Sequence, residues 1–223
     1  MSKFSLLCAA LLLLTVQTAS GQDYRVEPVD SAPEGEGVSE EITKLISDQG
    51  YRVIKGSSRT VCEIWFCKDL EIDPDFEPTE ERLYPFTPGQ LIGVISFRRR
   101  GSEFRDQTIS KGWYTLRFGL QPVDGNHEGT SPTRDCLLLV DPTEDELPEP
   151  WDAEDLHKAS ANAAGSSHPA MLCLQRPSEG SEVAINHDES NDWWVLHVVA
   201  GGVANDKAQE VPMDLVVVGH AAE

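Results

Sequence analysis

The sequence has few basic residues, no metal-type cysteine spacing and no long hydrophobic run after its first 21 positions. Lysine and arginine number 18 against 38 aspartates and glutamates, which gives a formal net charge of −20 at pH 7. Because nucleic acids and anionic membranes are bound through clustered cations, this balance argues against both as partners. The later apolar runs are far shorter than the ~20 residues of a membrane-spanning helix, so we expect no integral membrane association.

One basic cluster stands out against this background. Arg98, Arg99 and Arg100 are consecutive at the end of a strand-like segment, and Arg105 follows nearby. Arginines at a strand end cap a sheet or pair with surplus carboxylates more often than they bind an anion. We expect the structural role here, and we interpret the acidic surface as a means of solubility.

Metal-type or redox-type C-x-x-C spacing is missing among the five cysteines. Cys8 belongs to the N-terminal apolar run. The other four, Cys62, Cys67, Cys136 and Cys173, allow three pairings, and the sequence does not choose among them. Cys62 and Cys67 should face opposite sides of one strand, so we expect no bond between them. One disulfide and buried free thiols remain open alternatives.

Common catalytic motifs are also missing. The sequence contains no Gly-x-Ser-x-Gly elbow, no phosphate-binding loop and no His-Glu-x-x-His helix. Acidic residues are too numerous for any pair to indicate a catalytic dyad. We therefore favour a binding or structural module over an enzyme, with an envelope polysaccharide or protein as a candidate partner.

The first 21 residues predict an export signal. Lys3 provides a positive start, Phe4 to Val16 form an apolar run, and small residues allow cleavage after Gly21 or Ser20. This pattern places the mature protein in the periplasm or the medium.

After the signal we expect a flexible leader over residues 22–37, rich in Pro, Gly and acids, and then one domain over residues 38–223. Helical spacing and capping residues predict two short helices, one between Ser39 and Gly50 and one from Asp152 to about Ala163. Strand-like segments begin at Tyr51 and recur at 61–67, 91–98, 113–120, 136–140, 170–176, 182–187, 193–200 and 211–219.

Short strands separated by turns and acidic, Pro-rich loops favour an all-β fold over a parallel α/β fold. We predict an antiparallel β-sandwich or a jelly-roll-like arrangement. His197 lies in one of these strands, where a half-buried structural histidine is a more common role than a ligand.

The clearest strand, 113–120, offers a candidate binding residue. Its apolar face carries Tyr114 and Leu116, whereas Trp113 shares the other face with Thr115 and Arg117. We expect this second face to be solvent-exposed, so Trp113 could stack on a sugar ring. Ordinary packing of the indole is the alternative.

A second candidate lies in a Gly-rich loop. Asp124, His127 and Glu128 carry oxygen and imidazole groups at short spacing, and His168 lies in another loop. Together they could hold a divalent metal ion, and a metal-dependent hydrolase is thus an alternative function. A solvated Asp-Gly-Asn turn explains the same residues on backbone grounds. The sequence implies no other cofactor.

Three stretches also resemble other proteins. Ile109 to Leu139 contains Lys-Gly-Trp-Tyr-Thr-Leu, and Glu63-Ile64-Trp65 and Ser167-His168-Pro169-Ala170 add to the pattern. This resembles a family of uncharacterised exported bacterial β-sandwich proteins whose core strand begins with Lys or Pro, Gly and x-Tyr-Thr-Leu. The resemblance implies export and a β-sandwich, and it supplies no activity or catalytic residue. By contrast, Gly125-Asn126-His127-Glu128 is similar to a metallophosphoesterase signature, but the order of the other motifs does not fit that family.

Overall fold

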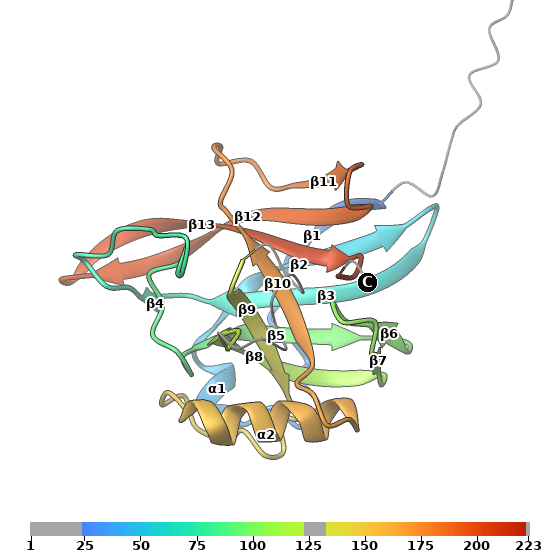
Figure 1. Ribbon diagram of the computed structural model, residues 1–223, viewed down its shortest axis with the longest axis horizontal. Helices are drawn as coiled ribbons and strands as arrows, with labels where there is room; N and C mark the ends of the chain where they lie inside the picture. The colour runs from blue at the N-terminus through green and yellow to red at the C-terminus, as the bar shows by residue number, and fades with distance from the viewer. Residues whose placement is uncertain (1–23, 123–132, 222–223) are drawn as a thin grey trace, which may run out of the picture.

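The computed structural model describes residues 24–122 and 133–221. Its main element is one curled, largely antiparallel sheet with the strand order β1-β2-β3-β5-β8-β9-β10-β13-β12-β11 (Figure 1). The strands of this path are β1 Tyr24–Val29, β2 Ile46–Lys55, β3 Arg59–Cys67, β5 Leu91–Phe97, β8 Gly112–Leu120, β9 Asp135–Val140, β10 Met171–Gln175, β11 Ala184–Asp188, β12 Trp193–Ala204 and β13 Lys207–Val218.

Few elements lie outside this path. The short strand β4 (Leu70–Glu71) pairs in parallel with β12, while β6 (Gly101–Ser102) and β7 (Thr108–Ile109) pair with each other. Among the described residues there are two helices, α1 (Glu40–Thr43) and α2 (Ala153–Ala164). The all-β class with two short helices is therefore confirmed.

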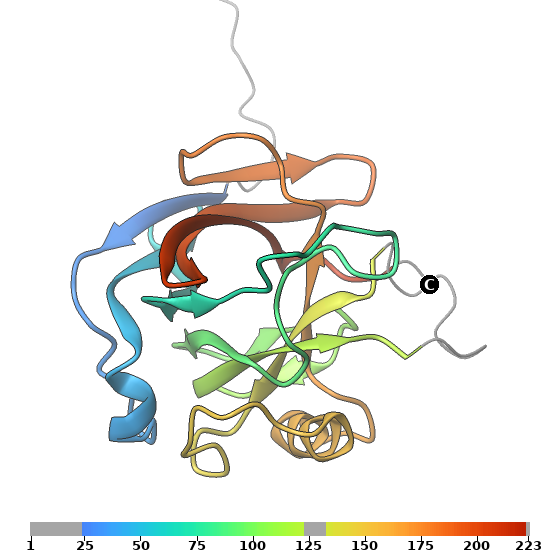
Figure 2. The ribbon, with the colours of Figure 1, turned by 90° about the vertical axis from the view of Figure 1, so that its left-hand side faces the viewer.

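The sheet curls until its two edge strands, β1 and β11, lie side by side (Figures 1 and 2). There the rings of Tyr24 and Trp194 are 4.8 Å apart, and the His187 ring stacks on Trp194 at 4.5 Å. The two halves of the sheet face each other across the main apolar core, as in a sandwich. Fully buried residues from many strands fill this core, among them Ile64, Ile92, Leu116, Phe118, Leu137, Leu196, Met213 and Leu215.

Helix α2 lies against the outer face of the sheet (Figure 2). A second, smaller core fills the space between this helix and the strands β9 and β10. It contains Leu156 and Ala159 of the helix, together with Cys136, Leu138, Val140, Met171 and Cys173 of the two strands. The carboxylate of Asp152 caps the helix by accepting from the Glu154 N–H, and Gly165 ends it in the left-handed conformation. The predicted limits of this helix are confirmed.

The N-terminal segment differs from the predicted leader. Residues 24–29 form β1, and all six pair with β2 over Gly50–Lys55. Tyr24, Val26 and Val29 are half-buried against the main core. Pro28 is compatible with this strand because β1 lies at an edge of the ladder.

The first predicted helix is much shorter than expected. Ser39 does cap it, since its hydroxyl accepts from the Ile42 N–H at 3.2 Å, but the helix ends at Thr43. Gly50 is not a helix terminator: it lies in β2 opposite Trp65. A Cβ at Gly50 would come within 2.4 Å of the Trp65 indole nitrogen, so the indole requires glycine there.

All four described cysteines are buried, and none of them forms a disulfide. Cys136 of β9 lies directly opposite Cys173 of β10. Burial raises the pKa of the Cys62 and Cys67 thiols to about 12 each, which disfavours the reactive thiolate. Neither thiol is placed as a nucleophile.

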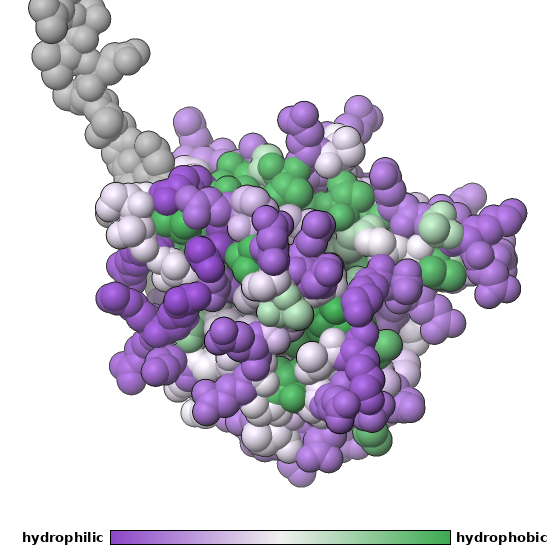
Figure 3. Space-filling view, turned by 180° about the vertical axis from the view of Figure 1, so that it is seen from behind, coloured by the Kyte–Doolittle hydropathy of each residue, from purple (hydrophilic) through white to green (hydrophobic). Residues whose placement is uncertain are grey.

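Hydrophilic residues cover most of the face seen from behind, with apolar residues in small groups between them (Figure 3). Within the two described stretches, neither helix is long and apolar enough to cross a membrane. The predicted signal, residues 1–21, lies outside the described residues.

Candidate functional site: a cavity beneath helix α2

The outer face of β8 is less exposed to solvent than the sequence predicts. Thr115 and Arg117 share this face with Trp113, yet both have no exposed surface. The loop between β9 and α2 covers them and supplies the Asp145 carboxylate, which is also fully buried. The prediction that this face is exposed was wrong, because alternation identifies the two faces of a strand but not what covers each one.

Arg117 holds that loop in place with all five of its N–H donors. Nε and one terminal nitrogen donate to Asp145 at 2.8 and 2.6 Å. The remaining donors reach the carbonyls of Gly89, Glu149 and Leu147. Since α2 begins immediately after this loop, Arg117 also helps to position α2 over the sheet.

A second buried carboxylate shapes the loop opposite α2. Glu103 accepts from the backbone N–H groups of Arg105, Gln107 and Met171 at 2.7, 2.9 and 2.9 Å. Burial raises the pKa of Glu103, while these hydrogen bonds act in the opposite direction. The contacts fix the backbone of Arg105 against the start of β10.

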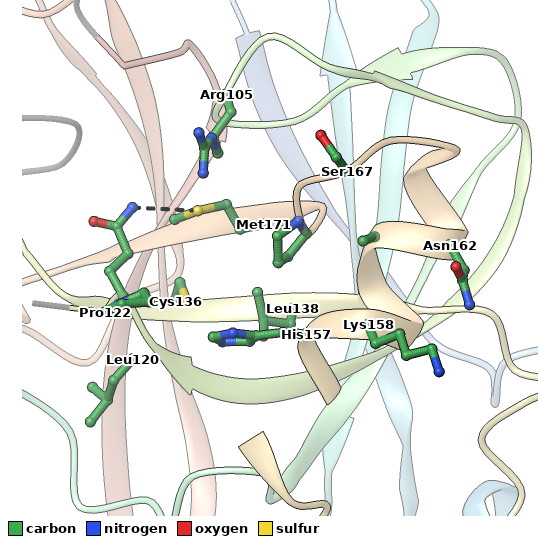
Figure 4. Close-up of a pocket in the computed structure, with 13 residues that line it drawn as sticks. Arg105, Leu120, Pro122, Cys136, Leu138, His157, Lys158, Asn162, Ser167 and Met171 are labelled. Carbon is green, nitrogen blue, oxygen red and sulfur yellow. Dashed lines mark hydrogen bonds between the residues drawn. The ribbon is translucent and has the colours of Figure 1, made fainter. Parts of the chain in front are cut away.

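Between these two supports lies a cavity of about 370 Å³ (Figure 4). In Figure 4, Arg105 and Ser167 lie on one side of the hollow, and Leu138 and His157 lie on the other. The remaining lining residues come from β8, β9, β10, α2 and the segments next to them: Leu120, Gln121, Pro122, Cys136, Leu138, His157, Lys158, Ala161, Asn162, Pro169 and Met171.

The lining combines an apolar interior with a polar rim. Leu138, Met171 and Leu120 provide apolar surface, and the Gln121 amide donates to the Met171 sulfur at 3.5 Å. Arg105 is half-buried, and its guanidinium forms no hydrogen bond or ion pair with the described part of the chain. The volume and composition are those of a small-molecule site, with Arg105 as a donor for an acidic group.

The predicted metal ligands are only partly placed. Asp124, His127 and Glu128 lie outside the described residues, and His168 is exposed in the turn after α2. Ser167 and Pro169, which flank His168, line the same cavity as Pro122. Over residues 24–122 and 133–221, no group of three His, Cys, Asp or Glu side chains is placed to hold a metal ion.

Trp113 lines a separate groove of about 440 Å³. Its ring is half-buried, with the Trp65 ring 5.4 Å away, and Trp65 is fixed by an indole N–H donated to the Ser31 carbonyl. The groove is polar: Glu34, Glu36, Arg52, Glu63, Arg98 and Lys111 line it.

Glu63 is the buried centre of this groove. Arg52 donates to it at 2.6 Å, and Arg98 donates to both of its oxygens at 2.9 and 3.0 Å. Burial alone would raise the pKa of Glu63, but these bonds and the two positive charges hold that pKa below its usual value. The expected pairing with a carboxylate is thus found for Arg98.

Ser178, His197 and Asp214 also come together, but not as a catalytic triad. Ser178 Oγ and Asp214 both contact Nδ1 of His197, at 3.1 and 2.5 Å. Nε2 faces the carbonyl of Gly180 at 3.2 Å. A serine nucleophile is activated through the ring nitrogen opposite the aspartate, so this network is structural. His197 is buried in β12, in line with its expected structural role.

Comparisons with protein-family models, with curated proteins and with solved structures found no match. The function is therefore inferred from the cavities themselves. Sequence reasoning missed the cavity beneath α2, although the resemblance stretches 109–139 and 167–170 supply much of its lining.

Proposed function

We propose that the protein is an exported binding module whose cavity beneath α2 holds a small molecule with an apolar body and a carboxylate. The observation that carries this proposal is Arg105, a half-buried cation without a described partner at the rim of a cavity with an apolar interior. In a chain with 38 acidic residues, a guanidinium that pairs with none of the described ones is available to a ligand.

Export forms part of this proposal, and the pattern of Lys3, the apolar run and Gly21 supports it. Expression of the full chain in a bacterial host, followed by N-terminal sequencing of the periplasmic fraction, tests it. A mature start at Gln22 or Gly21 is expected. An intact N-terminus in the cytoplasmic fraction would contradict export.

Binding is tested with two probes of the same shape, 4-phenylbutyrate and 4-phenylbutanol, followed by the backbone amide signals of the ¹⁵N-labelled protein. The acid should shift signals of β9, β10 and α2 at lower concentration than the alcohol. Arg105→Gln should remove this preference, whereas Arg176→Gln, a matched change of an exposed arginine elsewhere, should keep it.

A substitution that fills part of the cavity provides the second control. Ala161→Phe places a ring at the cavity wall and should abolish the shifts from both probes. Absence of saturable shifts in the unmodified protein, or an acid preference unchanged by Arg105→Gln, would contradict the proposed site.

A second candidate function is saccharide binding in the Trp113 groove. The half-buried Trp113 ring is supported by Trp65 and surrounded by charged side chains that can bond hydroxyl groups. Native electrophoresis through immobilised polysaccharides should retard the protein, and Trp113→Ala should lose this retardation while Trp151→Ala keeps it. Equal mobility in gels with and without polysaccharide would exclude this function for the polymers used.

A further inference from the structure

A third cavity is lined by several basic residues, although the protein as a whole is acidic. It is a cleft of about 330 Å³, and its lining includes Lys55, Arg59, Arg99, Arg100 and His220. We call these five residues and the space between them the cationic cleft. Its lining comes from the β2–β3 turn, the start of β6 and the end of β13. These segments lie at the same end of the curled sheet (Figure 1).

The basic residues of this cleft outnumber its described carboxylates. Among the described residues of the lining, Asp106 is the one acidic residue, and its carboxylate accepts from the Ser102 hydroxyl at 3.1 Å. Arg59, Arg99 and Arg100 form no side-chain hydrogen bond or ion pair with the residues of 24–122 or 133–221. Lys55 contacts the face of the Tyr24 ring at 5.2 Å.

Arg98 shows that this arrangement is selective. It follows the same strand, yet it lines the groove that contains Trp113 and pairs with Glu63 there. The next two arginines enter the cleft instead. The expectation of a purely structural cluster is therefore met by Arg98 and not by Arg99 and Arg100.

The net charge of −20 does not prevent an anion from binding here. Salt screens exposed charges beyond about 8–10 Å at physiological ionic strength, so the cations of the cleft dominate the local field. Arginine also presents several N–H donors in a planar fork that matches phosphate and sulfate oxygens. Three residues that carry hydroxyl groups, Tyr24, Thr60 and Ser102, belong to the same lining.

We infer that the cationic cleft is a binding site for a phosphate or sulfate ester group. It is separate from the cavity beneath α2, and it does not depend on the proposed function. A phosphorylated small molecule and a sulfated saccharide both carry this chemistry.

The experiment titrates the ¹⁵N-labelled full-length mature protein with inorganic phosphate, glucose 6-phosphate and glucose 6-sulfate at constant ionic strength. Saturable shifts are expected at the backbone amides of Arg99, Arg100 and Gly101. Tighter binding of one ester than of the other assigns the source, and equal binding assigns a general site for tetrahedral anions.

Two double variants provide the comparison. Arg99→Gln with Arg100→Gln should weaken binding at least tenfold, and because both side chains are exposed, the fold should persist. Arg176→Gln with Lys207→Gln removes the same charge from exposed positions outside the cleft and should change the affinity less than twofold. Absence of saturable shifts with all three ligands, or equal weakening in both variants, would overturn the inference.

Discussion

Two arginines near α2 are held in opposite ways. Arg117 is fully buried, and each of its five donors has an acceptor from Asp145 or a backbone carbonyl. Arg105 is half-buried at a cavity rim, and its guanidinium has no partner among the described residues. A fully bonded arginine builds the fold, whereas one with free donors beside an apolar cavity is available for binding.

The largest effect is expected when the fully bonded arginine, Arg117, is replaced. Arg117→Met leaves the buried Asp145 carboxylate without its cation, and loss of one partner of a buried pair costs about 3–5 kcal/mol. Urea unfolding followed by circular dichroism should show this decrease in the free energy of unfolding. A loss below 1 kcal/mol would mean that Arg117 does not hold the loop to the sheet.

A smaller effect is expected at Glu63. Glu63→Gln weakens its bonds to Arg52 and Arg98 and should lower the free energy of unfolding by about 2 kcal/mol at pH 7. Because the folded pKa of Glu63 is lowered, its contribution is present above the usual pKa of about 4.3 and is lost as pH falls through the folded value.

The pH dependence separates this mechanism from simple loss of packing. Between pH 7 and pH 3, the variant should lose less stability than the unmodified protein, measured by urea unfolding at each pH. Parallel stability curves for the two proteins would show that the charge of Glu63 does not contribute.

The smallest effect is expected at Arg105. Since its guanidinium makes no bond with the described residues, Arg105→Gln should change the free energy of unfolding by less than about 0.5 kcal/mol. The same urea titration measures it beside Arg117→Met. A loss comparable to that of Arg117→Met would make Arg105 structural and remove the contrast.

Local signals in the sequence predicted part of this structure. Asp152 and Gly165 mark the ends of α2 because capping depends on neighbouring backbone groups alone. The alternation of residues 113–120 likewise identifies β8. The helix predicted around Ile42 was extended too far, because the helical spacing of apolar residues continues past its end at Thr43 into β2, where Gly50 lies opposite Trp65.

The candidate sites depended on contacts that sequence does not show. The alternation of β8 separates Arg117 from Tyr114, but only the folded loop brings Asp145 to Arg117. Arg105 and Leu138 meet across one cavity because β9, β10 and α2 assemble there. Arg98 and Arg99 are neighbours in the chain, yet they face different cavities. Which arginine pairs and which stays available is decided by tertiary structure.

One spectrum tests this contrast most directly. In ¹⁵N-arginine-labelled protein, the side-chain Nε–Hε signals of Arg105 and Arg117 can be followed together during titration with 4-phenylbutyrate. We predict that the Arg105 signal shifts saturably while the Arg117 signal stays in place. An unmoved Arg105 signal while the ligand binds, or equal shifts of both signals, would contradict the account.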